Sequence, residues 1–329
     1  MIGSAAPSRQ ADADALAKQG HLSPMPLTRR KRALRIALIV CLCLVVAGLI
    51  VSWSVAGALV APKPQTVGDP PGELNTTSFT IASDSGSTIH GWHTRPEHSD
   101  GVVVLLHGMG GSRLCMLERA RVLHAAGYAT VMIDLQAHGE SPGNAITAGH
   151  LEKHDARAAV GLARREHPNE PIGVIGVSLG GAAAALASPL GIDALVIESV
   201  YPNIRDAIHN RVAAKLGPLS ALPSALLLIQ LKPRFGISPA ALRPIDHLPN
   251  VGCPVFVLSG TEDRHTRVPE TQAMFAAVRG SKELWLVDGA AHVDLHGHDP
   301  TQYRARILRF FDRHLRNGRG TLPPSPSPR

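Results

Sequence analysis

One short stretch constrains the fold more than any other: an apolar run that passes directly into a row of small residues through a single serine. The run Ile172–Ile175 is typical of a buried strand, and Gly181–Ala187 is typical of a helix. Ser178 lies between them, with Gly176 and Gly180 two positions away on either side. A sharp strand-to-helix turn needs such neighbours because it brings two backbones close together. The pattern predicts an exposed Ser178 hydroxyl at a helix N-terminus, where free N–H groups favour a developing negative charge.

A serine hydroxyl is a poor nucleophile at neutral pH, so a catalytic Ser178 needs a base and a group that orients the base. The alternative is an ordinary strand-to-helix turn with no chemistry. His292 is the candidate base among the 17 histidines, because it follows a predicted strand at 283–287 and so lies at the same edge of the sheet as Ser178. A surface-loop histidine is the other interpretation of His292.

The orienting acid is expected in a loop after another strand, between the serine and the histidine in the chain. Asp263 follows the predicted strand 255–259 and is the candidate. Glu262 is the adjacent alternative. His296 and His298 come after His292, but no carboxylate or thiolate cluster completes a metal site, so we interpret them as solvated loop residues.

An oxyanion needs two preorganised N–H donors. The backbone N–H of Leu179, next to the nucleophile, is one candidate, and that of Met109 in the loop His107–Ser112 is the other. A glycine-rich loop without this role is the alternative. His107 is interpreted as a structural residue that holds the loop.

Strands and helices alternate through most of the remaining chain, which predicts a mostly parallel sheet covered on both faces. A hairpin is expected at 78–94, and a helix at 147–166. Prolines and helical stretches interrupt the alternation between Tyr201 and Pro249. The strand pattern then resumes and continues to a last helix at 301–315.

The N-terminal part predicts a membrane anchor. Residues 1–35 form a polar tail that ends in the basic cluster Arg29–Arg32 and Arg35, and the uncharged run Ile36–Val60 follows. A helix of that length rises roughly 37 Å, more than the ~30 Å hydrocarbon core of a bilayer. Because the cluster precedes the run, we expect a cytoplasmic N-terminus and an extracytoplasmic domain. The alternatives are a cleaved signal peptide ending near Ala58 and a buried soluble helix.

Residues 61–75 contain four prolines and are expected to form a stiff linker to a domain at 76–316. Residues 317–329 are expected to be a disordered tail. The net charge of +7 is partly local to the basic cluster, beside an apolar segment, which favours anionic lipid over nucleic acid. Aromatic residues make up only 4% of the chain, too few for a base-stacking platform.

The chain resembles the α/β-hydrolases, and within them membrane-anchored, serine-aminopeptidase-like hydrolases. Five motifs in order carry the resemblance: His107–Gly111, Asp134–Ser141, Gly176–Gly181, Gly260–Asp263 and Ala290–His292. The order Ser, Asp, His is the order of that fold. The resemblance implies an eight-stranded, mostly parallel sheet, Ser178 on a nucleophile elbow after strand five, and a cap at 201–249 between strands six and seven. It also implies that Asp134 and Ser141 shape the floor of the site.

These residues predict a membrane-anchored serine hydrolase that cleaves a small acyl ester or a lipid-like ester through an acyl-enzyme, with no cofactor or metal. A peptidase or amidase with the same triad is one alternative. An anchored interaction protein that keeps the fold without catalysis is another. The loop His107–Gly111 departs from the His-Gly-Gly-Gly loop of one lipase and esterase group, so the substrates of that group are not implied.

Overall fold

The computed structural model describes residues 27–317, so most of both predicted tails lies outside the described residues. The strands are β1 (Lys63–Pro64), β2 (Thr76–Ala82), β3 (Thr88–Thr94), β4 (Val102–Leu106), β5 (Ala129–Ile133), β6 (His138–Gly139), β7 (Ile172–Val177), β8 (Ala194–Glu198), β9 (Val255–Gly260) and β10 (Lys282–Val287). The α-helices are α2 (Leu27–Val60), α3 (Leu117–Ala125), α4 (Glu152–Glu166), α5 (Leu179–Ala187), α6 (Ile204–Leu216), α7 (Ala221–Ile229), α8 (Leu231–Phe235), α9 (Val268–Ala277), α10 (Leu295–His298) and α11 (Pro300–Phe311).

The main sheet has eight strands in the order β10-β9-β8-β7-β4-β5-β3-β2. Strands β2 and β3 form the predicted hairpin, and β3 is also antiparallel to β5. The other neighbours in the sheet pair in parallel. The predicted eight-stranded, mostly parallel sheet is therefore confirmed, and β7, the fifth strand of this sheet along the chain, leads to Ser178.

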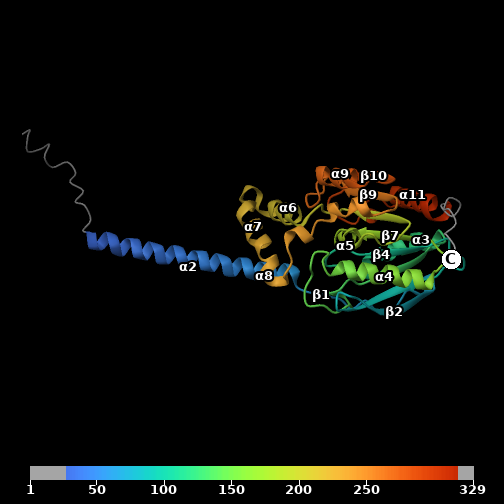
Figure 1. Cartoon of the computed structure of the whole chain (residues 1–329), viewed down its shortest axis with the longest axis horizontal. Coiled ribbons are helices and arrows are strands. Elements are labelled where there is room, and N and C mark those ends of the chain that lie inside the picture. Colours follow the sequence, from blue (N-terminus) through green and yellow to red (C-terminus); the bar gives the residue numbers. More distant parts are fainter. Residues whose placement is uncertain (1–26, 318–329) are drawn as a thin grey trace, which may run out of the picture. The chain divides into compact units, whose positions relative to one another are not determined.

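Side chains of the central strands alternate between two hydrophobic layers. In β4, Val102, Val104 and Leu106 belong to one layer, whereas Val103 and Leu105 belong to the other. Helices α4, α5 and α9 contribute to the first layer, and α3 and α11 contribute to the second. Figure 1 shows these helices around the strands. A strand that is buried on both faces has no polar side to display, which explains its unbroken apolar sequence.

Helix α4 begins later than the predicted helix 147–166. The Glu152 carboxylate accepts hydrogen bonds from the backbone N–H groups of Thr147 and Gly149, at 2.8 Å each, and from the Thr147 hydroxyl at 2.7 Å. Ala148 and Gly149 both have positive φ values, which a helix does not allow. The residues before Glu152 therefore form a loop that is tied to the start of the helix.

The region 201–249 lies between β8 and β9, the sixth and seventh strands of the main sheet, and contains α6, α7 and α8. The side chain of Asn203 caps α6 by accepting a hydrogen bond from the N–H of Asp206. These helices lie together beyond one end of the sheet (Figure 1). By length and composition Ile204–Phe235 could cross a membrane, but it is divided into the short helices α6, α7 and α8 between β8 and β9.

Helix α2 begins at Leu27, before the apolar run, and includes the basic cluster that was expected to be part of the tail. Lysine and arginine are good helix formers, so the helix continues through them. By length and composition Thr28–Val60 could also cross a membrane. The chain divides into two compact units at this helix, one ending at Val51 and the other beginning at Ser52.

The range predicted as a linker, 61–75, begins with residues that pair with the domain. Strand β1 lies parallel to β6, and the Lys63 N–H donates to the Ala137 carbonyl at 2.7 Å. The Gln65 side chain donates to the Gly110 carbonyl at 3.0 Å. Prolines do not prevent this short pairing, because it uses the N–H groups of non-proline residues.

An ionic network, buried at Arg119 and Glu198 but half exposed at Asp294, lies around the end of β8. The Arg119 guanidinium of α3 contacts the Glu198 carboxylate at 2.7 Å and the Asp294 carboxylate at 2.7 Å. Tyr303 of α11 also donates a hydrogen bond to Glu198. Only 3% of Arg119 and 1% of Glu198 is exposed. Each charge has therefore lost its hydration and is stabilised by the opposite charge beside it.

Replacing Arg119 with methionine should therefore destabilise the domain. The Arg119→Met variant leaves a buried carboxylate without its cation, which costs about 3–5 kcal/mol. The matched control is Arg121→Met on the same helix, because Arg121 pairs with Glu73 and Glu118 at the surface. Denaturant unfolding measures both free energies, and equal losses in the two variants would contradict the role of the network.

Candidate active site

Ser178 lies at the turn between β7 and α5 in a strained backbone conformation. Its φ is 47° and its ψ is −106°, a region that residues with a side chain rarely adopt. The Ser178 N–H donates to the Glu198 carbonyl at 2.8 Å, and the Ser178 carbonyl accepts from Ala182 N–H at 2.9 Å. These hydrogen bonds hold the turn from both the sheet side and the helix side.

The flanking glycines are required by close packing. A Cβ atom on Gly176 would lie 2.5 Å from the Gly181 backbone, and a Cβ on Gly180 would lie 2.4 Å from the Leu106 carbonyl oxygen. Real Cβ atoms do not approach backbone atoms so closely. The sharp turn predicted from the glycine spacing is therefore present, but Ser178 is buried and not exposed as expected, because the cap and the loops around the site cover it.

The structure brings Ser178, His292 and Asp263 together. The Ser178 Oγ lies 3.3 Å from His292 Nε2, and His292 Nδ1 lies 2.7 Å from the Asp263 Oδ2 atom. The carboxylate accepts the Nδ1 proton, which leaves Nε2 as the acceptor for the serine hydroxyl. These contacts have the geometry that a nucleophile, a base and an orienting acid require.

Asp263 is buried but remains ionised. Burial alone would raise the pKa of its carboxyl, but the hydrogen bond and the charge of His292, together with backbone N–H groups, lower the pKa below its usual value. These N–H donors belong to His265 and Thr266 and lie 2.8 Å from Oδ1. The ionised carboxylate stabilises a positive charge on His292.

The alternative residues lie elsewhere. Glu262 is exposed, and no hydrogen bond joins its carboxylate to His292 among the contacts of residues 27–317. The His298 side chain contacts the Asp288 carbonyl at 3.0 Å, and the His296 ring packs against Tyr303. Within the described part of the chain no cluster of three or more His, Cys, Asp or Glu residues could hold a metal ion.

The two residues expected to supply oxyanion donors lie beside Ser178. Leu179 is the first residue of α5, and Met109 lies in the loop after β4; both line the same pocket as Ser178. His107 holds this loop. Its Nε2 accepts from the Leu135 N–H at 3.0 Å, so its Nδ1 carries the proton and donates to the Gly108 carbonyl at 2.7 Å. Burial lowers the pKa of His107 to about 3, so the ring stays neutral.

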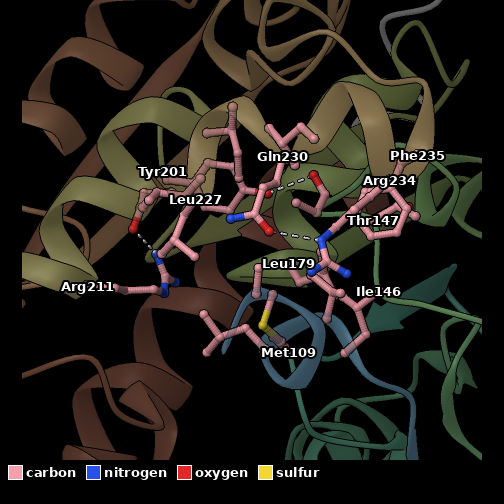
Figure 2. A pocket seen from close by; sticks show the side chains of 18 of the residues that line it. Met109, Ile146, Thr147, Leu179, Tyr201, Arg211, Leu227, Gln230, Arg234 and Phe235 are labelled. Carbon is pink, nitrogen blue, oxygen red and sulfur yellow. Dashed lines mark hydrogen bonds between the residues drawn. The ribbon is translucent and has the colours of Figure 1, made fainter. Parts of the chain in front are cut away.

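Two cavities meet at Ser178. An open cleft of about 530 Å³ is lined by residues that include His292, His265 and Arg119. A narrower apolar pocket of about 150 Å³ extends from Ser178 beneath the cap. Figure 2 shows side chains from several segments converging on this pocket. They come from the end of α2, the loop after β4, the loop before α4, the turn at Ser178 and the cap region: Ala56, Leu59, Val60, Met109, Ile146, Thr147, Ala148, Leu179, Tyr201, Ile204, Ala207, Ile208, Arg211, Leu227, Gln230, Leu231, Arg234 and Phe235.

Asp134 and Ser141 line neither cavity. Asp134 is fully buried, forms an ion pair with Arg113 and accepts a hydrogen bond from the Glu140 N–H at 2.9 Å. The Ser141 hydroxyl donates to the Asp134 carbonyl at 2.7 Å. The expectation that they form the floor of the site was wrong; they fix the loop after β5.

Several residues of the site were not predicted from the sequence. Arg119 shares a helix face with Met116, Ala120 and Leu123, which are buried, so its position in the helical pattern was a signal. Arg211 lines both cavities, and burial lowers its pKa. Ala56, at the end of α2, had no such signal, because its surroundings have the composition of a membrane helix.

The known proteins to which this chain is similar include hydrolases. Residues 97–222 match the family model described as "Serine aminopeptidase, S33". The protein YqkD of Bacillus subtilis, described as uncharacterized, is 24% identical over 73% of this chain and 80% of its own length. A monoacylglycerol lipase of Mycolicibacterium smegmatis is 32% identical, over 36% of this chain and 46% of the lipase.

A solved structure agrees over a longer part of the chain. The esterase Pf2001 of Pyrococcus furiosus superposes with a TM-score of 0.64 at 25% identity. The superposition covers 78% of this chain and 98% of the esterase. The similarity therefore extends over nearly the full length of that esterase.

Replacing Ser178 with glycine should stabilise the domain relative to Ser178→Ala. Glycine tolerates the backbone angles of this turn, whereas alanine keeps a strain of about 1–3 kcal/mol. Denaturant unfolding of both variants measures the difference. Ala158→Gly in the middle of α4 is the control, because a helical backbone gives glycine the opposite effect. A Ser178→Gly variant less stable than Ser178→Ala would show that the turn is unstrained.

Proposed function

Because the chain is an α/β-hydrolase of the esterase- and lipase-like kind, we propose that it hydrolyses carboxylic esters through Ser178, His292 and Asp263. The observation that carries this proposal is the chain of contacts from Ser178 Oγ to His292 at 3.3 Å and from His292 to Asp263 at 2.7 Å. Ser178 lines an apolar pocket, and this supports an acyl ester or a lipid-like ester as substrate.

In the proposed acylation step, Ser178 Oγ attacks the carbonyl carbon while His292 Nε2 takes the hydroxyl proton. The N–H groups of Met109 and Leu179 hold the negative oxygen of the tetrahedral intermediate. The bond to the alcohol oxygen then breaks, and His292 gives its proton to that oxygen. The ionised Asp263 stabilises His292 while the ring is positively charged.

In the deacylation step, His292 takes a proton from a water molecule that attacks the acyl-enzyme. The bond between the acyl carbon and Ser178 Oγ breaks, and the serine recovers its proton from His292. The products are a carboxylic acid and an alcohol, and no cofactor takes part in this cycle. Amide hydrolysis uses the same steps. It is the second candidate function, because the matching family is described as a serine aminopeptidase family.

We expect Asp263→Asn to lower kcat for a p-nitrophenyl ester by about 10³–10⁴-fold, because the amide no longer favours the correct tautomer of His292. Ser178→Ala should reduce hydrolysis to background. Glu262→Gln is the matched control, since Glu262 is adjacent to Asp263 but exposed, and should retain activity. A p-nitroanilide with the same acyl group, assayed in parallel, separates esterase from amidase activity. An Asp263→Asn variant with normal kcat would contradict the triad.

We also propose that α2 anchors the enzyme, with its N-terminus in the cytoplasm and the hydrolase domain outside. The support lies in the part of α2 before Ser52, where large apolar side chains such as Leu38, Leu42 and Leu44 are more than half exposed. A long exposed apolar helix is stable in a bilayer and not in water. The basic cluster that precedes these residues favours the cytoplasmic side.

Protease added to spheroplasts should therefore remove a C-terminal tag from the full chain, while the protein should resist carbonate extraction from membranes. A cytoplasmic marker protein, expressed in the same cells, is the control for intact spheroplasts. Release of the chain by carbonate, or a tag that is protected until the membrane is dissolved, would contradict this topology.

A further inference from the structure

The last turns of α2, from Ser52 to Val60, belong to the same compact unit as the hydrolase domain. Polar contacts with the cap hold this segment. The Gln230 amide donates to the Ser52 hydroxyl at 2.9 Å. The Arg234 guanidinium stacks over the Trp53 ring, 3.7 Å from its centroid, and donates to the Trp53 carbonyl.

The end of the helix is also held from the side of the sheet. The Val60 carbonyl accepts a hydrogen bond from Ile146 N–H at 2.8 Å, in the loop before α4. A few residues later, β1 pairs with β6, and Gln65 contacts the carbonyl of Gly110 in the loop that carries Met109. The segment is therefore fixed between the cap and the loops of the active site.

This fixed segment forms one wall of the apolar pocket beside Ser178. Ala56, Leu59 and Val60 line the pocket, and only 6% of Ala56 is exposed. Their spacing of three and four residues places them on one face of the helix. The small side chain of Ala56 leaves space between the helix and the opposite walls, which include Leu179 and Leu227.

We propose that Ser52–Val60 is part of the acyl-binding site, and that Ala56 and Leu59 help to set the length of acyl chain that the enzyme accepts. The inference rests on the acyl-transfer function proposed above. An acyl group attached to Ser178 Oγ has two directions available, the open cleft beside His292 and the apolar pocket. A hydrocarbon chain favours the pocket, because each buried methylene group is worth about a fourfold gain in binding.

This role differs from that of a simple anchor. A helix that only tethered the domain would be exchangeable for any other helix of suitable length. A helix that forms a pocket wall contributes to substrate selection, so a change at one residue of its inner face must alter specificity. Removing residues before Ala61 to obtain a soluble domain would also remove this wall.

The test compares Ala56→Phe with Ala58→Phe in the full chain, purified in detergent. Ala58 lies two positions away, is exposed and does not line the pocket. The readout is the ratio of kcat/KM for p-nitrophenyl octanoate to that for p-nitrophenyl acetate. We expect Ala56→Phe to lower this ratio at least tenfold, because the ring fills the pocket, and Ala58→Phe to leave it unchanged.

Leu59→Ala provides a second variant, in which no larger side chain has to be accommodated. It should raise kcat/KM for p-nitrophenyl esters with acyl chains longer than octanoate, relative to that for p-nitrophenyl octanoate. Unchanged ratios in both Ala56→Phe and Leu59→Ala, or the same change in Ala58→Phe, would overturn the inference. In those cases the wild type still hydrolyses acetate and the proposed function stands. A wild type that hydrolyses no ester would overturn both.

Discussion

The close contact between β7 and α5 is the constraint on which the site depends. Gly176 has no space for a Cβ atom because it packs against Gly181 of α5, and Gly180 has none because it packs against Leu106 at the end of β4. This packing keeps Ser178 at a positive φ and places its hydroxyl beyond the end of the strand. The strain, about 1–3 kcal/mol at such positions, is offset by the packing and the hydrogen bonds that surround the turn.

The other parts of the site are positioned by the same sheet. Asp263 and His292 follow the parallel strands β9 and β10, whose carboxyl ends lie at the same edge as that of β7. The Arg119 network adds a second connection. It joins Glu198, whose carbonyl accepts from the Ser178 N–H, to Asp294, two residues after His292. Ser178 and His292 are thus linked through the ion pairs of Arg119 as well as through the sheet.

Much of this could be predicted from the sequence, because local patterns decide it. Glycine spacing around Ser178, and apolar runs that end before Asp263 and His292, are local consequences of a parallel sheet with its loops at one edge. The start of α4 was not predictable from helix propensity, because the Glu152 carboxylate holds the preceding loop in another conformation.

The end of α2 could not be assigned to the pocket from the sequence either. An apolar helix face that meets a lipid and one that meets a substrate pocket have the same composition. The contacts that distinguish them, such as Gln230 with Ser52 and Ile146 with Val60, join residues far apart in the chain. The pairing of β1 with β6 could not be predicted for the same reason, because the paired residues lie far apart in the chain.

The most direct test of the central claim is covalent labelling of the full chain by a fluorophosphonate, followed by peptide mass spectrometry. Such a probe reacts with a serine that an adjacent base has activated. The account predicts one modified site, at Ser178, and no labelling of Ser178→Ala. A folded protein that stays unlabelled, or is labelled at another serine, would contradict an activated Ser178.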